Sequence, residues 1–330
     1  SGTAALHLAL KAIGLKEHDE VIIPTNTFTA TGEVITYFNA KPVLIDCGKE
    51  NFNIDENKIE PKITKNTKAI MPVHFGGNPC EMGIIKNICA KYDLKLIEDA
   101  AHALTSKFQG DFIGTLGDIT CFSFYATKNI TTGEGGMAVT ANPLYAEKIR
   151  KLSLHGINVD AWNRYGTKGS WFYEVSDAGY KYNMSDILAS IGTIQMKKAE
   201  MMLEKRTHIA NTYTNKLSNI SSINLPKSNI ENRHAWHLYV IQIKPEQLNI
   251  NREQFIDKLK DYNIGSSVHF IPLHRHPYYQ SKFRYSPKEF PNSESIYNRS
   301  ISLPIYPKMT ETDVNYVIQA VKHIVSTNKK

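Results

Sequence analysis

The chain has 330 residues, of which 42% are hydrophobic and 22% are charged, and it carries a formal net charge of +7. This length is enough for a large buried core and predicts one large domain with a smaller second one. The basic residues are scattered among acidic ones, and no apolar run approaches the ~20 residues that span a bilayer, so the composition argues against nucleic-acid binding and membrane insertion.

Short apolar runs alternate with helical patterns through the first half of the chain. Four of these runs are nearly continuous, as in strands that are covered on both faces: 21–23, 43–45, 69–73 and 95–97. A helical pattern at 84–89 lies between the last two. This order predicts an α/β fold with a doubly wound, mostly parallel sheet. Two further strands are expected at 119–125 and 137–140, on either side of a glycine-rich turn.

The second half of the chain has a different character. From Met184 to about Lys216 the pattern predicts one long helix, whose apolar side includes Leu188, Ile191, Ile194 and Met196. After Pro226 the sequence indicates a smaller α+β unit of four elements: a strand at 236–243, a helix at 252–262, a strand at 266–270 and a terminal helix at 312–325. We therefore expect a large domain over 1–205 and a small C-terminal domain over 206–330.

The apolar strand at 95–97 runs directly into the carboxylates of Glu98 and Asp99. Ligands of open α/β sheets bind beside the carboxyl ends of the strands. A buried Asp99 at this end needs a cationic partner, because burying an unpaired carboxylate is costly. A protonated pyridine nitrogen is one such partner. Taken alone, the residue is more often a helix N-cap.

The strand at 119–125 leads to Lys128, and Gly133-Glu134-Gly135-Gly136 follows as a tight turn. A lysine in this position is usually a solvated edge residue. The alternative is a lysine that forms a Schiff base, in a site that lowers its pKa. Ser123 lies five residues earlier, about 16 Å away along an extended strand. Only a bend before Lys128 brings both residues to one ligand.

Two shorter motifs have weaker signals. Ser1-Gly2-Thr3-Ala4 opens a helical pattern, and the free backbone N–H groups of a helix start can bind an anion. Plain N-capping by Ser or Thr is the alternative. Phe28 follows a predicted strand, so its ring can stack on a flat cofactor or simply belong to the core.

Together and in this order, these motifs resemble the nucleotide-sugar aminotransferases, a branch of the fold type I enzymes that depend on pyridoxal 5′-phosphate. The resemblance extends from Ser1 nearly to the C-terminus, and its most distinctive part is Phe122-Ser123-Phe124 followed by Lys128 and Gly135-Gly136. Within the branch, the chain is most similar to the enzymes of the UDP-4-amino-4-deoxy-L-arabinose type, which act on a UDP-4-keto-pentose in lipid A modification. That similarity rests on the stretches 155–161, 179–183 and 268–270.

The resemblance implies a role for each motif. Lys128 is then the residue that holds pyridoxal 5′-phosphate as a Schiff base and later moves a proton, with pyridoxamine phosphate as the intermediate form of the cofactor. Asp99 is the carboxylate that pairs with the pyridinium nitrogen. The phosphate site then consists of Gly2, Thr3, Ala4 and Ser123. The aromatic residue that stacks on the cofactor ring is Phe28, and the residue beside the ring is His102.

The resemblance also implies a homodimer, in which Asn183 reaches the cofactor phosphate of the partner subunit. The substrates are then L-glutamate and a nucleotide keto-sugar, UDP being the expected nucleotide, and 4-amination is favoured over 3-amination. The product serves surface polysaccharide, lipid A or glycan biosynthesis. Substrate-binding candidates are Tyr180, Lys181, His269, Arg275, Tyr306 and Trp162.

Several alternatives stay open for individual residues. Tyr180, Lys181 and Tyr182 either line the cleft or shape the turn that presents Asn183. The tract His274-Arg275-His276 is equally consistent with a solvated turn, and no carboxylate or cysteine at matching spacing supports a metal site there.

Other functions compete with transfer to a sugar. An amino-acid aminotransferase or a cysteine desulfurase of the same fold type needs an arginine clamp or a mobile cysteine, and no cysteine follows Lys128. A sugar dehydratase on this scaffold replaces the lysine with histidine. A non-catalytic protein of the same fold has no need of intact Lys128, Asp99 and Ser123.

Two further expectations concern the cell and the chain ends. The four cysteines form no CxxC pair, which predicts free, mostly buried thiols and a cytoplasmic protein: Cys47, Cys80, Cys89 and Cys121. Members of the family carry some tens of residues before the Ser-Gly-Thr motif, including part of the substrate site and of the dimer contacts. We expect such a segment to precede Ser1.

Overall fold

A computed structural model describes residues 1–157 and 172–330. Its main sheet has six strands in the order β2-β1-β3-β4-β7-β8. Neighbouring strands are parallel except for β8, which runs antiparallel to β7. The strands are β1 (Glu20–Pro24), β2 (Lys41–Ile45), β3 (Thr67–Ile70), β4 (Lys95–Asp99), β7 (Ile119–Ser123) and β8 (Gly136–Val139). The predicted α/β fold with a mostly parallel sheet is confirmed.

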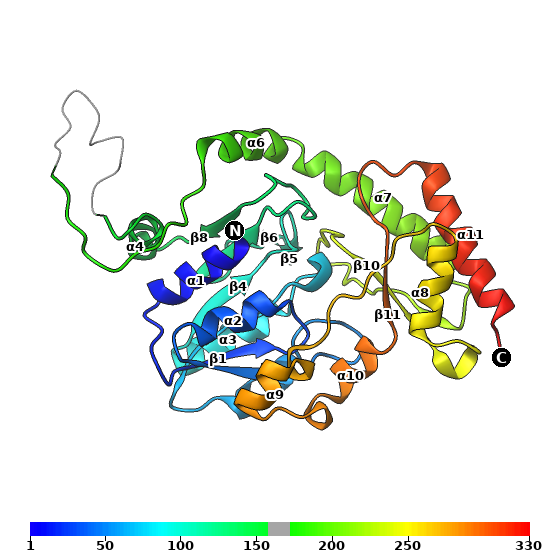
Figure 1. Ribbon diagram of the computed structural model, residues 1–330, viewed down its shortest axis with the longest axis horizontal. Helices are drawn as coiled ribbons and strands as arrows, with labels where there is room; N and C mark the ends of the chain where they lie inside the picture. The colour runs from blue at the N-terminus through cyan, green and yellow to red at the C-terminus, as the bar shows by residue number, and fades with distance from the viewer. Residues whose placement is uncertain (158–171) are drawn as a thin grey trace.

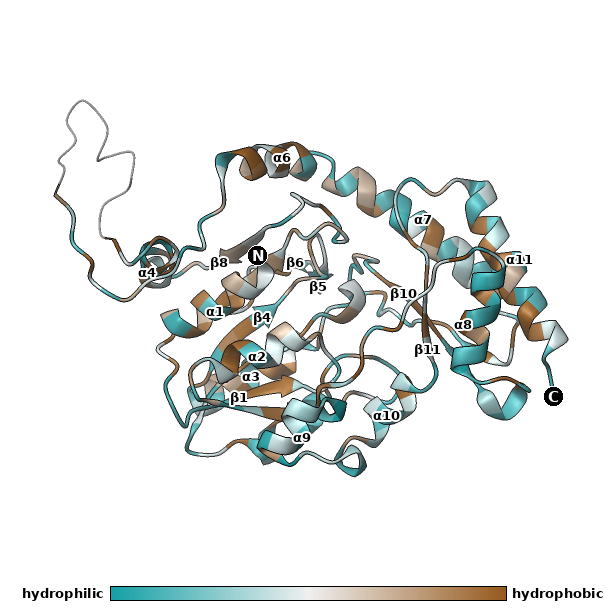
Figure 2. Cartoon of the chain, in the orientation of Figure 1, coloured by the Kyte–Doolittle hydropathy of each residue, from teal (hydrophilic) through white to brown (hydrophobic). Residues whose placement is uncertain are grey.

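Helices cover both faces of this sheet, as the continuous apolar strands predict (Figure 1). Successive residues of a strand point to opposite faces. Val21 and Ile23 accordingly pack with α1 and α2, whereas Ile22 packs with α3. Figure 2 shows the apolar strands enclosed between the layers. The helices of this part are α1 (Gly2–Ala12), α2 (Thr29–Thr36), α3 (Met82–Tyr92) and α4 (Pro143–Ser153).

A second core lies in the C-terminal part of the chain. Three antiparallel strands in the order β11-β10-β9 pack against three helices, with Tyr213, Tyr239 and Phe255 fully buried among them. This unit matches the small α+β unit that the sequence predicts. Its elements are α7 (Ala199–Leu217), β9 (Ile223–Asn224), β10 (Tyr239–Ile243), α8 (Arg252–Asp261), β11 (Ser300–Leu303) and α11 (Glu311–Thr327).

Two predicted elements are wrong. The single long helix is in fact α6 (Asp186–Met196) and α7, because the backbone of Lys198, at φ −101° and ψ −2°, departs from regular helical geometry between them. The apolar pattern continues across this break and hides it. The expected strand at 266–270 is absent, since Ser267 forms only an isolated bridge to Ser302.

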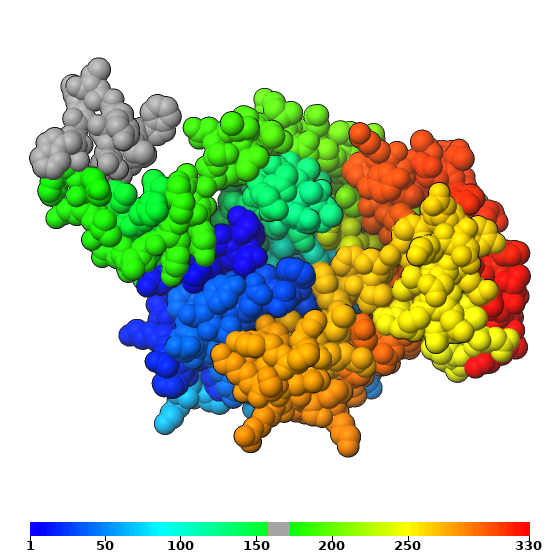
Figure 3. All heavy atoms as spheres, viewed as in Figure 1, coloured from blue at the N-terminus to red at the C-terminus, as the bar shows by residue number. Residues whose placement is uncertain are grey.

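A segment between α8 and β11 packs against the core of the large sheet, although it lies in the C-terminal part of the sequence. Leu273, Tyr279 and Phe290 pack in the same cluster as α1 and α2, and Figure 3 shows this segment in orange against the blue N-terminal part. Residues 273–290 therefore belong by packing to the large unit, while the boundary near 205 stays a proposal. The helices here are η5 (Leu273–Arg275), α9 (Pro277–Phe283), η6 (Pro287–Glu289) and α10 (Pro291–Tyr297).

Short elements connect the rest: η1 (Glu56–Lys58), η2 (Glu60–Lys62), η3 (Phe75–Gly77), β5 (Lys107–Phe108), β6 (Asp111–Phe112) and η4 (Pro245–Gln247). All four cysteines are free and buried, as expected. Within residues 1–157 and 172–330, no helix has the length and apolar character that a membrane crossing requires. The candidate Trp162 lies outside the described residues.

Candidate active site

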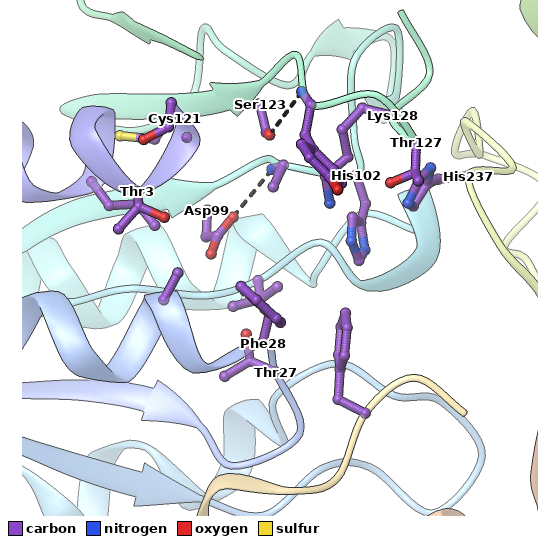
Figure 4. Close-up of a pocket in the computed structure, with 18 of the residues that line it drawn as sticks. Thr3, Thr27, Phe28, Asp99, His102, Cys121, Ser123, Thr127, Lys128 and His237 are labelled. Carbon is purple, nitrogen blue, oxygen red and sulfur yellow. Dashed lines mark hydrogen bonds between the residues drawn. The ribbon is translucent and has the colours of Figure 1, made fainter. Parts of the chain in front are cut away.

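A cavity of about 350 Å³ opens at the carboxyl ends of β4 and β7. This volume lies within the ~300–1,000 Å³ that is typical of small-molecule sites. Figure 4 shows Thr3, Asp99 and Ser123 toward one end of the cavity and His102, Lys128 and His237 toward the other. The sheet topology explains the convergence, because β4 and β7 are parallel neighbours and Asp99 is paired in register with Cys121.

Asp99 ends β4 inside this cavity and is buried. The Thr31 hydroxyl donates a hydrogen bond of 2.7 Å to Oδ2, and the Ala101 N–H donates one of 3.1 Å to Oδ1. Burial raises the pKa of the carboxyl group, and these two hydrogen bonds and the charge of Lys128 oppose that rise. No ion pair to Asp99 is found among the described residues, so the carboxylate can accept a cation from a ligand.

Lys128 follows β7 in a turn, where its N–H donates a 2.9 Å hydrogen bond to the carbonyl oxygen of Tyr125. This turn supplies the bend that the spacing required, because Ser123 and Lys128 both line the cavity. Burial lowers the pKa of the Lys128 ammonium from 10.5 to about 8, against the opposing charge of Asp99. A lysine with such a pKa is partly a neutral amine near neutral pH and can act as a nucleophile.

The start of α1 forms the end of the cavity beside β7. Ser1 caps the helix by accepting a 3.1 Å hydrogen bond from the Ala4 N–H. A Cβ atom on Gly2 would lie only 2.9 Å from Cβ of Ser123, so this position needs glycine for the helix to approach the strand. The first N–H groups of the helix and the Ser123 hydroxyl are donors suited to an anion such as a phosphate. Ala4 itself does not line the cavity.

Aromatic rings form another wall of the cavity. Phe28 is 56% exposed and lines the cavity, so it is not a core residue. His102 accepts a 3.2 Å hydrogen bond from the Gly76 N–H at Nδ1, which assigns its ring proton to Nε2. Its ring lies 5.8 Å from Phe270 and 4.3 Å from His237 between centroids. Burial and the charge of Lys128 keep the pKa of His102 well below its usual value, so the ring is neutral.

Three residues at the site were not predicted from the sequence as single functional candidates: Thr31, His237 and Phe270. Phe270 stands beside the candidate His269, which lines the same cavity and has Nδ1 at 2.8 Å from the Ser302 hydroxyl. No local signal marks Thr31 or His237. Only the packing of α2 and of the C-terminal part brings them to β4 and Lys128.

The other substrate candidates lie elsewhere. Tyr306 lines a second cavity, which shares Lys128 with the first. Arg275 lines neither cavity, because Glu294 binds its Nε at 2.6 Å and its guanidinium lies over the ring of Tyr297. The adjacent His274 is fully buried, so the tract is not a solvated turn.

Asn183 lies in a hollow on the outer side of α1, where its Oδ1 accepts a hydrogen bond from Lys181. Tyr180 stacks on Tyr182 and packs against His7, with ring centroids 5.0 Å and 4.7 Å apart. The structure thus does not bring these side chains to the cavity that holds Asp99 and Lys128 in their own chain. Within the described ranges, no group of three or more potential metal ligands is placed to hold an ion.

Comparison with known protein sequences gives matches along the whole chain. The chain is 56% identical over 329 residues to the uncharacterized protein MJ1066 of Methanocaldococcus jannaschii, covering 100% of this chain and 85% of that protein. It is 48% identical to the spore coat polysaccharide biosynthesis protein SpsC of Bacillus subtilis (98% and 84% covered). It is 40% identical to the UDP-4-amino-4-deoxy-L-arabinose–oxoglutarate aminotransferase of Shewanella sediminis (98% and 85% covered).

Solved structures agree with these sequences. The putative sugar aminotransferase Spr1654 from Streptococcus pneumoniae superposes in its PMP form with a TM-score of 0.92 at 32% identity, covering 99% of this chain and 86% of that one. Its PLP form gives a TM-score of 0.90. The fold is therefore that of the fold type I transferases. The family model for the DegT/DnrJ/EryC1/StrS aminotransferases matches residues 1–322. The chain belongs to the DegT/DnrJ/EryC1/StrS aminotransferase family.

Proposed function

We propose that this chain is a pyridoxal 5′-phosphate-dependent aminotransferase that moves the amino group of L-glutamate to the 4-keto position of a UDP keto-sugar, for surface polysaccharide, lipid A or glycan biosynthesis. One observation carries the proposal: Lys128 and Asp99 share one buried cavity with the start of α1. The names of the relatives from Bacillus subtilis and Shewanella sediminis support a polysaccharide pathway and 4-amination.

The donors and acceptors of the cavity fit the cofactor. The N–H groups of Gly2 and Thr3 and the Ser123 hydroxyl would hold its phosphate. The buried Asp99, which has no ionic partner among the described residues, would pair with its ring nitrogen, and Phe28 and His102 would lie against its ring. When bound, pyridoxal phosphate supplies an electron sink for the bonds of a substrate carbon atom.

Lys128 performs two tasks in this proposal. Its neutral amine would hold the cofactor, and the same amine would hold and return the proton that the substrate carbon atom exchanges. The pKa of about 8 suits both tasks, because the amine is a usable base near neutral pH and its conjugate acid is a usable acid. Asp99 stays ionised when a cation faces it, since an opposite charge favours the carboxylate.

We further propose a cytoplasmic homodimer, in which Asn183 serves the cofactor site of the partner subunit. Asn183 lies outside its own chain's cavity. No residue of α6, which follows Asn183 closely, is buried in the single chain, and Ile187 is 76% exposed. An unpartnered apolar helix face of this kind is typical of a protein interface.

A spectroscopic experiment tests the chemistry. The visible band of the lysine-bound cofactor should disappear when L-glutamate is added, and 2-oxoglutarate should accumulate. Adding a UDP-4-keto-sugar should restore the band. If simple 2-oxo acids restored the band and the UDP-4-keto-sugar did not, the proposal that a keto-sugar accepts the amino group would be wrong. If L-glutamate left the band unchanged, the proposal that L-glutamate is the amino donor would be wrong.

A charged residue placed on the exposed face of α6 tests the proposed dimer. Ile187→Glu should shift the protein toward monomer in analytical ultracentrifugation and should lower activity with it. Ile230→Glu is the matched control, because Ile230 is 98% exposed and lies far from α6 in the sequence. A dimer that tolerates both changes equally would contradict the role of α6.

A further inference from the structure

The side chain of Asp99 has fewer hydrogen bonds than the other buried carboxylate of β4. A carboxylate has about four positions at which it accepts a hydrogen bond. The described part of the chain fills two of these positions on Asp99, from the Thr31 hydroxyl and the Ala101 N–H. It gives three hydrogen bonds to Glu98, the preceding residue. Asp99 therefore keeps acceptor positions for a ligand, and its orientation depends on two contacts.

The Thr31 hydroxyl makes the shorter of these two contacts. Its Oγ1 lies 2.7 Å from Asp99 Oδ2, and the Ala101 nitrogen lies 3.1 Å from Oδ1. Thr31 is the third residue of α2 and is fully buried, so water does not compete for its hydroxyl. A threonine side chain in a helix has two common rotamers, so the backbone of α2 determines where this hydroxyl points.

A second hydroxyl orients the first one. Thr27 Oγ1 lies 2.7 Å from Thr31 Oγ1, and Thr27 is buried as well. A hydroxyl group has one hydrogen to donate, and an ionised carboxylate can only accept. Because Thr31 donates its hydrogen to Asp99, it accepts the hydrogen bond of Thr27. We call these two residues, Thr27 and Thr31, the hydroxyl chain.

The hydroxyl chain favours the ionised form of Asp99. Burial raises the pKa of this carboxyl group, and the hydrogen bond from Thr31 opposes the rise most strongly, ahead of the Ala101 N–H and the charge of Lys128. A hydrogen bond to the charged form of a group stabilises that form. The carboxylate can then face a cation inside a site that excludes water.

The hydroxyl chain also links three elements around the cavity. Thr27 lies in the loop after β1 and lines the cavity beside Phe28, Thr31 lies in α2, and Asp99 ends β4. Figure 4 shows Thr27 and Phe28 below Asp99. The loop that carries the aromatic ring is thus tied to the carboxylate through two buried hydroxyl groups.

We propose that Thr31, oriented by Thr27, is a positioning residue whose hydroxyl keeps Asp99 ionised and directed at the protonated ring nitrogen of the cofactor. This inference rests on the proposed pyridoxal-phosphate-dependent function and adds to it a residue that acts on Asp99. Thr31 itself does not line the cavity, so it acts through Asp99.

Two cofactors that differ in one ring atom test this role. The first is pyridoxal phosphate, and the second is its analogue with a C–H group in place of the ring nitrogen, which cannot pair with Asp99. Fluorescence titration of the cofactor-free protein measures both dissociation constants. Thr31→Val removes the hydroxyl and keeps the branched shape. We expect it to weaken binding of pyridoxal phosphate about tenfold and to leave binding of the analogue unchanged.

Thr120→Val is the matched control. The buried Thr120 hydroxyl donates a 2.6 Å hydrogen bond to the buried Glu98, whose side chain points to the opposite face of β4, and neither residue lines the cavity. This variant should leave the ratio of the two dissociation constants unchanged. If Thr31→Val does not fold, Thr31→Ser and Thr31→Ala decide, because they differ only in the hydroxyl: serine should keep the wild-type ratio and alanine should lose it.

Three results would overturn the inference. Thr31→Val could weaken both cofactors equally, as a purely structural role predicts, or it could weaken neither. Thr120→Val could change the ratio as much as Thr31→Val does. Failure of the proposed function is a separate result that the wild type shows, because L-glutamate would then leave its visible band unchanged.

Discussion

The two cavities that meet at Lys128 differ in how the chain satisfies their polar groups. In the cavity beside β4 and β7, Asp99 has two hydrogen bonds from the protein and His102 has one from Gly76. In the second cavity, no described residue bonds Arg206 Nε or Ser266 Oγ. The protein thus holds the polar groups of the first cavity in place, as in a site that is organised in advance for a bound group.

Removal of the Lys128 side chain, which lines both cavities, should have the largest effect. Lys128→Ala is expected to abolish the visible cofactor band and to lower turnover on the order of 10³-fold or more, because attachment and proton transfer both depend on this amine. Spectra and a glutamate-dependent 2-oxoglutarate assay measure it. A variant that keeps the band would contradict the role of Lys128.

Asp99→Asn changes the lining of the first cavity alone, because Asp99 does not line the second. The amide cannot pair with a charged ring nitrogen, so turnover should fall on the order of 10²-fold. The side chain keeps its size and can still accept from the Thr31 hydroxyl. Steady-state kinetics measure the loss. Near-normal turnover would remove Asp99 from the mechanism.

The pH dependence of cofactor loading tests the environment of Lys128. Only the neutral amine attacks an aldehyde, so the rate at which the cofactor-free protein gains its band should rise about tenfold per pH unit below pH 8 and level off above it. Asp99→Asn removes a charge that raises the lysine pKa, so its midpoint should lie lower than that of the wild type. A rate still rising at pH 10 would show an ordinary lysine.

Ser123→Ala should have the smallest effect. Loss of one hydroxyl contact to a phosphate should weaken pyridoxal phosphate binding about tenfold, with turnover restored at high cofactor concentration. Fluorescence titration of the cofactor-free protein measures the affinity. Ser326→Ala, near the end of α11, serves as the control. Equal affinities in the two variants would exclude Ser123 from the phosphate site.

The parts of this molecule that the sequence predicts are those that local patterns determine. The continuous apolar strands predict a sheet covered on both faces, and the motifs at Asp99 and Lys128 stand at the ends of two strands that prove to be neighbours. Motif order and strand ends were therefore enough to predict that Asp99 and Lys128 share one site, and the two residues do line one cavity.

The missed features depend on long-range packing. His237 lines a cavity with Lys128 only because the C-terminal core packs against the first unit, and no short pattern around His237 records that contact. The contact of Arg275 with Glu294 is long-range in the same way, and no short pattern around Arg275 indicates it. The break between α6 and α7 escaped detection because apolar residues continue on both sides of Lys198.

The central claim is that Lys128 carries the cofactor, and one measurement tests it directly. The protein loaded with pyridoxal phosphate is reduced with borohydride and digested, and mass spectrometry locates the pyridoxyl group. We expect the group on Lys128, in the peptide that follows β7. A pyridoxyl group on another lysine such as Lys181, or none at all, would contradict the account.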